Sequence, residues 1–226
     1  MSEPTPLDIG RIVEALDRHG VEYLLVGGVA AAAHGAARLT ADADTVVRRT
    51  AANLEATAAV LREINAYLLV EGLSDEEARA LPVQIDALTL TRMEISTWQT
   101  DADDLDILVE LPARDGHRLS YEDLLPRAVE AHYGADRIVV RIAALDDIIA
   151  SKQWADRPKD RDALPELLAM RNETQDKNSP RDKPPWVGRR DRYAAPATLV
   201  LLEAERPQPL SPCLSRPLKI VVWTDR

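Results

Sequence analysis

One stretch of the chain, GVAAAAHGAARLTADADTVV at 28–47, constrains the fold more than any other. Its first half is small and apolar, is bounded by Gly28 and Gly35, and follows the apolar run VEYLLVGG. Its second half carries acids at Asp42 and Asp44 and then continues into two valines. The pattern predicts a buried strand, a glycine turn, a short helix of small residues, and a second strand that begins with two acids.

The rest of the chain mixes helical and strand-like patterns. Apolar residues at helical spacing predict helices over 7–19, 51–65, 74–81, 144–155 and 160–171. Strand-like runs lie at 83–90, 92–100, 105–111 and 137–142, and a partly helical segment lies at 121–132. Because no regular alternation of strand and helix repeats, we expect an α+β fold with a small mixed sheet flanked by helices, C-terminal helices and a largely irregular tail.

The composition changes near residue 172. Residues 172–226 contain 8 of the 15 prolines, and they offer only two short apolar runs, ATLVLLEAE and LKIVVW, as candidate strands. Such a segment buries too little apolar surface to order itself. We therefore expect one folded domain over 1–171, followed by a Pro-rich, poorly ordered tail over 172–226.

Composition excludes several classes of protein. The chain has a net charge of −10, which argues against a broad nucleic-acid-binding surface but leaves room for a local basic patch. No apolar run approaches 18 residues, so we expect neither a membrane span nor secretion, and a cytoplasmic location. Cys213 is the only cysteine, which excludes an intramolecular disulfide and a cysteine-based zinc site.

Asp42 and Asp44 are the first candidate ligands. Residues two apart on a strand point to the same face, so these carboxylates would lie side by side and repel each other. A cation between them, or a proton on one of them, would relieve the repulsion, and Mg²⁺ suits such a pair. The alternative is a solvated strand face or a turn in which Asp42 bonds the local backbone.

Two further features lie near these acids in the expected fold. Gly27–Gly28, between a strand and a helix, would let the backbone approach a phosphate, although a tight turn would need the same residues. Asp106 sits inside the apolar run LDILVE, where a carboxylate is costly to bury without a partner. It would serve as a third metal ligand, or it would merely begin a strand beside the exposed acids Asp101, Asp103 and Asp104.

Lys152 and Asp160 are the last candidates. Lys152 continues the apolar stripe of Leu145, Ile148 and Ile149, so it either extends outward to solvent or points into a cleft. Asp160 also lies on an apolar stripe, and its alternative role is to cap the following helix, with Pro165 in the first turn.

Together, VGGVAAAAHGAARLTADAD, LDILVE and IIASKQWADRPKDRDALPEL resemble the DNA polymerase β-like nucleotidyltransferases. More narrowly, they resemble the AbiEii/MenT-type toxins of bacterial toxin–antitoxin systems. The resemblance covers about residues 7–171 and implies a nucleotidyltransferase-like sheet. It implies that Asp42, Asp44 and Asp106 bind metal. Gly28 stands where the wider superfamily usually has serine, so backbone N–H groups would bind phosphate there.

The resemblance also implies an activity: metal-dependent transfer of a nucleotide from an NTP to an acceptor hydroxyl. Two Mg²⁺ ions are expected, with Mn²⁺ as the alternative. The catalytic set would be Asp42, Asp44, Asp106, Lys152 and Asp160, and the nucleotide-binding set Gly27, Gly28, Arg38, Thr40 and Lys152. The acceptor would be a tRNA 3′ end or a protein hydroxyl, and a cognate antitoxin would be a partner. The alternative is a catalytically inactive nucleotide-binding or interaction protein.

Overall fold

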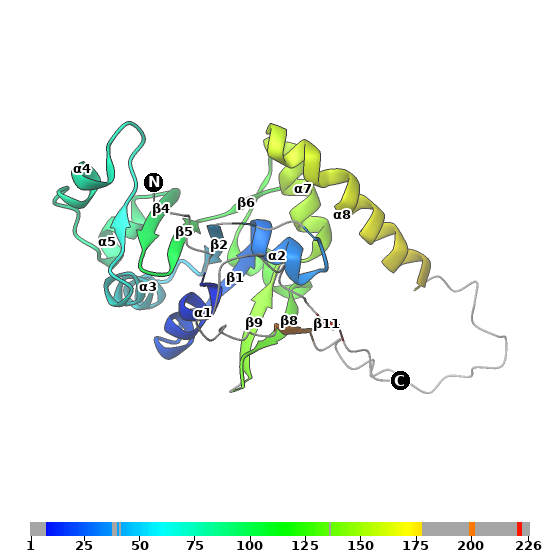
Figure 1. Ribbon diagram of the computed structural model, residues 1–226, viewed down its shortest axis with the longest axis horizontal. Helices are drawn as coiled ribbons and strands as arrows, with labels where there is room; N and C mark the ends of the chain where they lie inside the picture. Colours follow the sequence, from blue (N-terminus) through cyan, green and yellow to red (C-terminus); the bar gives the residue numbers. More distant parts are fainter. Residues whose placement is uncertain are drawn as a thin grey trace, which may run out of the picture.

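The computed structural model describes residues 8–37, 40, 42–135, 137–177, 199–201 and 221–222, and the side chains of those up to residue 174 (Figure 1). The α-helices are α1 (Ile9–Arg18), α2 (Gly27–Ala33), α3 (Ala51–Glu63), α4 (Asp75–Arg79), α5 (Ala87–Thr91), α6 (Tyr121–Leu124), α7 (Leu145–Ala155) and α8 (Pro158–Lys177), with a 3₁₀ turn η1 (Leu125–Arg127). The strands are β1 (Tyr23–Val26), β2 (Asp42–Val47), β3 (Tyr67–Leu68), β4 (Ile95–Thr100), β5 (Asp103–Leu108), β6 (Leu111–Pro112), β7 (Arg118–Leu119), β8 (Val129–Tyr133), β9 (Ile138–Ile142), β10 (Leu199–Leu201) and β11 (Val221–Val222).

Nine of these strands form one mixed sheet in the order β11-β10-β8-β9-β1-β2-β5-β4-β3. The pairs β1–β9, β2–β5 and β8–β10 are parallel, and the other neighbours are antiparallel. Helices flank the sheet, with α7 and α8 towards one end of the molecule and α4 and α5 towards the other (Figure 1). The expected α+β architecture with a mixed sheet and C-terminal helices is therefore present.

The hydrophobic core explains why the first elements form as predicted. Helix α1 buries Ile12, Val13 and Leu16 on one stripe and ends before Gly20, whose φ of +62° closes the turn. All four residues of β1 are buried, as the continuous apolar run indicated. The predicted helices over 51–65, 74–81 and 144–155 are present as α3, α4 and α7.

One predicted strand is wrong, and the segment expected to be partly helical is so. Residues 83–90 do not form a strand, because Asp86 accepts a hydrogen bond at 2.7 Å from the Thr89 N–H and begins the helix α5. Segment 121–132 is helical only in its first half, where Ser120 caps α6. Its second half is strand β8, which pairs with β9 along its length. The wrong strand prediction arises where a short apolar run fits either period.

The sheet register brings distant parts of the chain to the end of β1. The antiparallel pair β1–β2 sets Val26 opposite Asp44, directly beside the turn that begins α2. The parallel pair β1–β9 sets Leu25 opposite Ile142, and the Ala143 N–H donates to the Leu25 carbonyl at 2.9 Å. Helix α7 starts two residues later, and Ile148 and Lys152 of this helix line the same pocket as Val26 at the end of β1.

The C-terminal region is described only in part. Helix α8 runs from Pro158 to Lys177, past the boundary expected at 171, and the two candidate strands are present as β10 and β11. Residues 178–198, 202–220 and 223–226 lie outside the described residues, so the irregular tail stays a prediction. Within the described residues, none of the helices has the length and hydropathy that crossing a membrane requires.

Candidate active site

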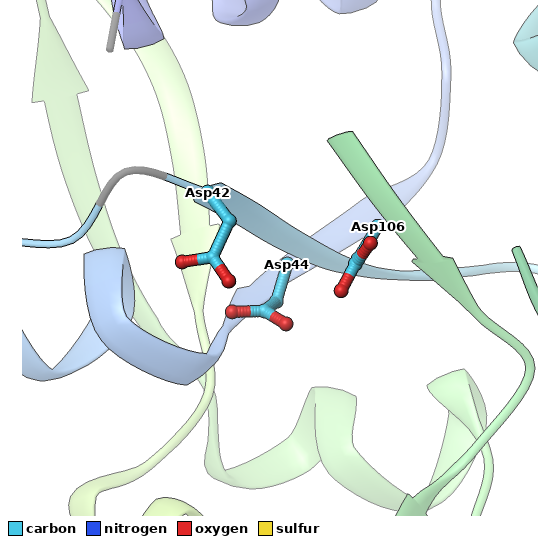
Figure 2. A group of neighbouring side chains, drawn as sticks. All are labelled: Asp42, Asp44 and Asp106. Carbon is cyan, nitrogen blue, oxygen red and sulfur yellow. The ribbon is translucent and has the colours of Figure 1, made fainter. Parts of the chain in front are cut away.

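Three aspartates from two neighbouring interior strands converge beside the end of β1 (Figure 2). Asp42 and Asp44 share one face of β2, and the parallel register places Asp106 of β5 opposite Asp44. One carboxylate oxygen of each residue lies within 4.8 Å of the other two, and all three side chains are half-buried. Three hard oxygen donors at this spacing form a set that could hold a divalent cation.

The cluster is electrostatically strained without a cation. Burial, followed by the charges of Asp42 and Asp106, raises the pKa of Asp44 to about 6. Burial and the charge of Asp42 also raise the pKa of Asp106, against the lowering effect of a hydrogen bond from Thr97. One carboxylate oxygen of Asp106, Oδ1, is buried with no hydrogen-bond partner. A bound divalent cation would lower both pKa values again, and it would give the Asp106 oxygen a partner.

The glycine turn beside this cluster is required by close packing. Gly27 has φ of +62°, and a Cβ atom there would lie 1.9 Å from Asp44 Oδ2. A backbone hydrogen bond from Gly28 to Asp44 lowers the pKa of that carboxyl and so opposes the effect of burial. The turn therefore holds Asp44 directly, in addition to any role it has towards a phosphate.

Thr40 fills the space beside Gly28. A Cβ atom at Gly28 would lie 2.6 Å from Thr40 Oγ1 and 2.7 Å from Thr40 Cβ, so a side chain there would displace Thr40. The Thr40 hydroxyl donates to a carboxylate oxygen of Asp42. A hydroxyl group thus lies directly beside Gly28, and it comes from the segment that precedes β2.

Lys152 and Asp160 meet through the packing of α7 on α8. Asp156 ends α7 in the left-handed region, with φ of 47°, and this turn returns the chain along α7. Lys152 Nζ lies 3.3 Å from Asp160 Oδ1, with the lysine side chain 16% exposed and the aspartate 0% exposed. Lys152 points into the cleft, and Asp160 pairs with it inside the first turn of α8 instead of capping the helix.

Two basic residues of the same motif were missed from the sequence. Arg157 Nε donates to Asp160 Oδ2 at 2.6 Å, and both Arg157 and Lys159 line the pocket that contains the three aspartates. Burial alone would raise the pKa of Asp160, but Arg157 and Lys152 lower it overall. The signal available in the sequence was the acid–base spacing of three residues between Arg157 and Asp160.

A fourth acid, Asp104, was wrongly expected to be exposed. Asp104 is half-buried, pairs with Asp42 across the parallel strands and lines the same pocket, and Asp103 is also half-buried. Burial and the charges of Asp103 and Asp106 raise the pKa of Asp104. Its position two residues before Asp106, on the same strand face, was the signal for this placement.

A pocket of about 540 Å³ collects most of the candidates. Its lining includes Gly27, Gly28, Thr40, Asp42, Asp44, Asp104, Asp106, Lys152, Arg157 and Lys159. Asp160 contributes indirectly, because it forms ion pairs with Lys152 and Arg157, which line the pocket. Arg38 lies outside the described residues, so its expected place in the site stays a prediction.

Comparisons with known proteins give only distant likenesses. Neither protein-family models nor curated sequences match the chain. The crystal structure of ANT(2'')-Ia in complex with adenylyl-2''-tobramycin is similar over 76% of this chain and 97% of its own, with 17% identity and a TM-score of 0.44. Lincomycin-bound LnuA, a lincosamide antibiotic adenylyltransferase, is similar over 72% of this chain and 96% of its own, with 14% identity and a TM-score of 0.48.

Proposed function

We propose that the chain is a metal-dependent nucleotidyltransferase that moves a nucleotide from an NTP to an acceptor hydroxyl. The observation that carries this proposal is the convergence of Asp42, Asp44 and Asp106 within 4.8 Å of one another. The same pocket carries Lys152, Arg157 and Lys159. A pocket lined by both acidic and basic side chains matches a substrate that consists of a divalent cation and a polyphosphate.

The three carboxylates fit Mg²⁺ by the chemistry of their donors. Asp106 Oδ1 is buried without a hydrogen-bond partner, which a coordinated cation would supply. Asp42, Asp44 and Asp106 would hold two ions, with Mn²⁺ as the alternative. When bound, Mg²⁺ would lower the pKa of the acceptor hydroxyl and neutralise charge on the triphosphate.

The remaining residues bind and orient the nucleotide. Lys152, Arg157 and Lys159 would contact the triphosphate, and Asp160 would position Lys152 and Arg157 through its two ion pairs. Gly27 and Gly28 allow the close approach of backbone to substrate, and the Thr40 hydroxyl would stand in for the missing serine. Catalysis would consist mainly of positioning and charge stabilisation, as in phosphoryl transfer generally.

For the biological role, we propose a toxin of a toxin–antitoxin system that modifies tRNA 3′ ends and is restrained by a cognate antitoxin. The motif resemblance over residues 26–44 and 148–167 supports this role. Nucleotide addition to a 3′ end would block aminoacylation of the tRNA. Protein nucleotidylation would use the same pocket with a different acceptor.

The test is incorporation of label from each of the four NTPs in the presence of Mg²⁺. The acceptors are total tRNA, lysate protein, and tobramycin and lincomycin, which are named with the two similar solved structures. We expect label on tRNA, none after removal of divalent cations, and none with Asp42→Ala/Asp44→Ala. The variant Glu71→Gln, which removes an exposed acid elsewhere, is the control.

Each outcome is decisive. Label on protein alone would replace the tRNA proposal with protein nucleotidylation. Label on an antibiotic alone would make the chain a small-molecule nucleotidyltransferase. NTP binding without incorporation into any acceptor would contradict the enzyme proposal and support the nucleotide-binding alternative.

A further inference from the structure

A second pocket, of about 610 Å³, adjoins the acidic one. Ile95 lines both pockets, and it pairs across the sheet with Leu108, two residues beyond Asp106 on β5. Two residues of a strand span ~7 Å, so the second pocket opens close to the carboxylate cluster. A molecule that presents a hydroxyl to the acids could extend directly into it.

Three arginines line this second pocket: Arg49, Arg92 and Arg118. None of them forms an ion pair with a carboxylate anywhere in the described part of the chain. Most other arginines with described side chains do form such pairs. Arg49 is oriented by the backbone, because its guanidinium donates to the Thr91 carbonyl at 2.6 Å and to the Met93 carbonyl at 3.4 Å.

The charge of the second pocket differs from that of the protein as a whole. Glu94 and Glu110 also line it, so three guanidinium groups face two carboxylates in a chain whose net charge is −10. A local excess of unpaired guanidinium groups attracts anions and repels cationic acceptors. Because guanidinium groups bind phosphate through two parallel hydrogen bonds, phosphate is the anion that the pocket suits best.

An exposed aromatic ring lies beside one of these arginines. The Arg118 guanidinium lies 4.9 Å from the centroid of the Trp154 ring, and Trp154 is 45% exposed. A planar cation stacked on an accessible indole is a surface on which nucleobases stack. Phosphate-binding arginines combined with such a surface favour a nucleic-acid strand over a protein as the ligand.

We propose that this arginine pocket, lined by Arg49, Arg92 and Arg118, binds the sugar–phosphate backbone of a single-stranded nucleic-acid acceptor and directs its terminal hydroxyl towards Asp106. The proposal rests on the proposed nucleotidyltransferase function for its location, and it adds the surface that would hold a nucleic-acid acceptor. Trp154 and Arg118 receive a base of the same strand. The acidic protein then binds its acceptor locally, at one patch.

The first test measures binding without catalysis. A fluorescein-labelled single-stranded RNA of about 12 nucleotides, within the usual range for a single-strand site, is titrated with the full chain at several salt concentrations. Arg92→Glu/Arg118→Glu should weaken binding by about tenfold or more and reduce the salt slope by about 1.4, because each single-strand phosphate contact contributes about 0.7. Arg137→Glu, the same type of substitution in the β8–β9 turn with half of that charge change, should leave binding unchanged.

The second test separates this proposal from the function on which it rests. Incorporation of labelled NTP into tRNA and the affinity for NTP are measured with the same variants, after thermal unfolding has shown that each is folded. Loss of incorporation with unchanged NTP affinity supports the arginine pocket. Loss of RNA binding in the double variant, without incorporation into any acceptor by the wild type, supports the pocket and contradicts the enzyme. RNA binding equal to that of the wild type overturns the pocket, whatever the activity.

Discussion

Asp44 and Asp106 are direct partners across the parallel strands β2 and β5, although they lie far apart in the sequence. Their carboxylates lie in one cluster with Asp42, at the point where β1 ends and the glycine turn begins. The arrangement concentrates negative charge in a half-buried place, and several consequences can be measured.

The stability of the metal-free protein should depend on the protonation of Asp44. Its pKa is about 6 in the folded state, above the ordinary value of 3.8, so the unfolded chain loses this proton first. The free energy of unfolding therefore falls as pH rises from about 4 to about 6, by up to about 3 kcal/mol. Urea unfolding with EDTA, from pH 4 to pH 7, should show this fall in the wild type and a smaller fall in Asp44→Asn. Equal pH dependence in both proteins would contradict the raised pKa.

Mg²⁺ should stabilise the folded protein through the aspartate cluster. At a concentration 100 times its Kd, a ligand that binds only the folded state adds about 2.7 kcal/mol to the free energy of unfolding. Asp42→Asn/Asp44→Asn should remove this gain, whereas Glu71→Gln should keep it. The measurement is thermal unfolding with and without MgCl₂ at pH 7. A gain of the same size in the double variant would place the cation elsewhere.

Gly27 should tolerate alanine much less well than Gly20 does, although both have φ of +62°. A Cβ atom at Gly20 meets nothing within 4 Å, so Gly20→Ala costs only the left-handed backbone, about 1–2 kcal/mol. A Cβ atom at Gly27 would lie 1.9 Å from Asp44 Oδ2, so Gly27→Ala should also displace that carboxylate. We expect Gly27→Ala to lose both more unfolding free energy and its response to Mg²⁺. Similar losses for the two variants would show that Asp44 moves freely.

Lys152 and Asp160 should separate activity from stability. Lys152→Ala leaves Asp160 paired with Arg157, so its cost in unfolding free energy should be about 1 kcal/mol. Asp160→Ala leaves the 16% exposed Lys152 without its partner, and about 3 kcal/mol should be lost. Lys152→Ala should nevertheless lower kcat/KM for NTP by about a hundredfold, since it removes the positive charge that would contact the triphosphate. Steady-state kinetics and urea unfolding on both variants would check the order.

Much of this fold and most of the candidate site follow from local patterns. The run at 28–47 and the apolar run before it predicted a strand, a turn, a helix and a strand, because the glycines divide the apolar residues into short segments and the two acids begin the last one. Asp106 and Lys152 were recognised as charged residues in apolar patterns. A charged residue in such a place indicates that it has a buried partner or that it faces a cleft.

One missed feature depends on a local hydrogen bond, and the others depend on neighbours that are distant in sequence. Residues 83–90 looked like a strand until the capping hydrogen bond of Asp86 was included. Asp104 looked exposed among other acids, because only the pairing of β5 with β2 brings it beside Asp42. Arg157 and Lys159 were unremarkable basic residues until the left-handed Asp156 folded α8 back along α7. Sheet register and helix packing are set by the whole chain, so the local spacing of Asp104 and Arg157 was a signal that did not by itself decide their placement.

The acids and the cations of the pocket are anchored to the protein in different ways. Asp42, Asp44 and Asp106 belong to interior strands that are hydrogen-bonded to neighbours on both edges, whereas Lys152 and Arg157 belong to a helical hairpin at one end of the molecule. Substitutions deep in the sheet should therefore shift all three carboxylates together and preserve their mutual spacing. Substitutions at the contact of α7 with α8 should instead alter the gap between cation and carboxylate, which makes that hairpin the place to look for variants with changed nucleotide preference.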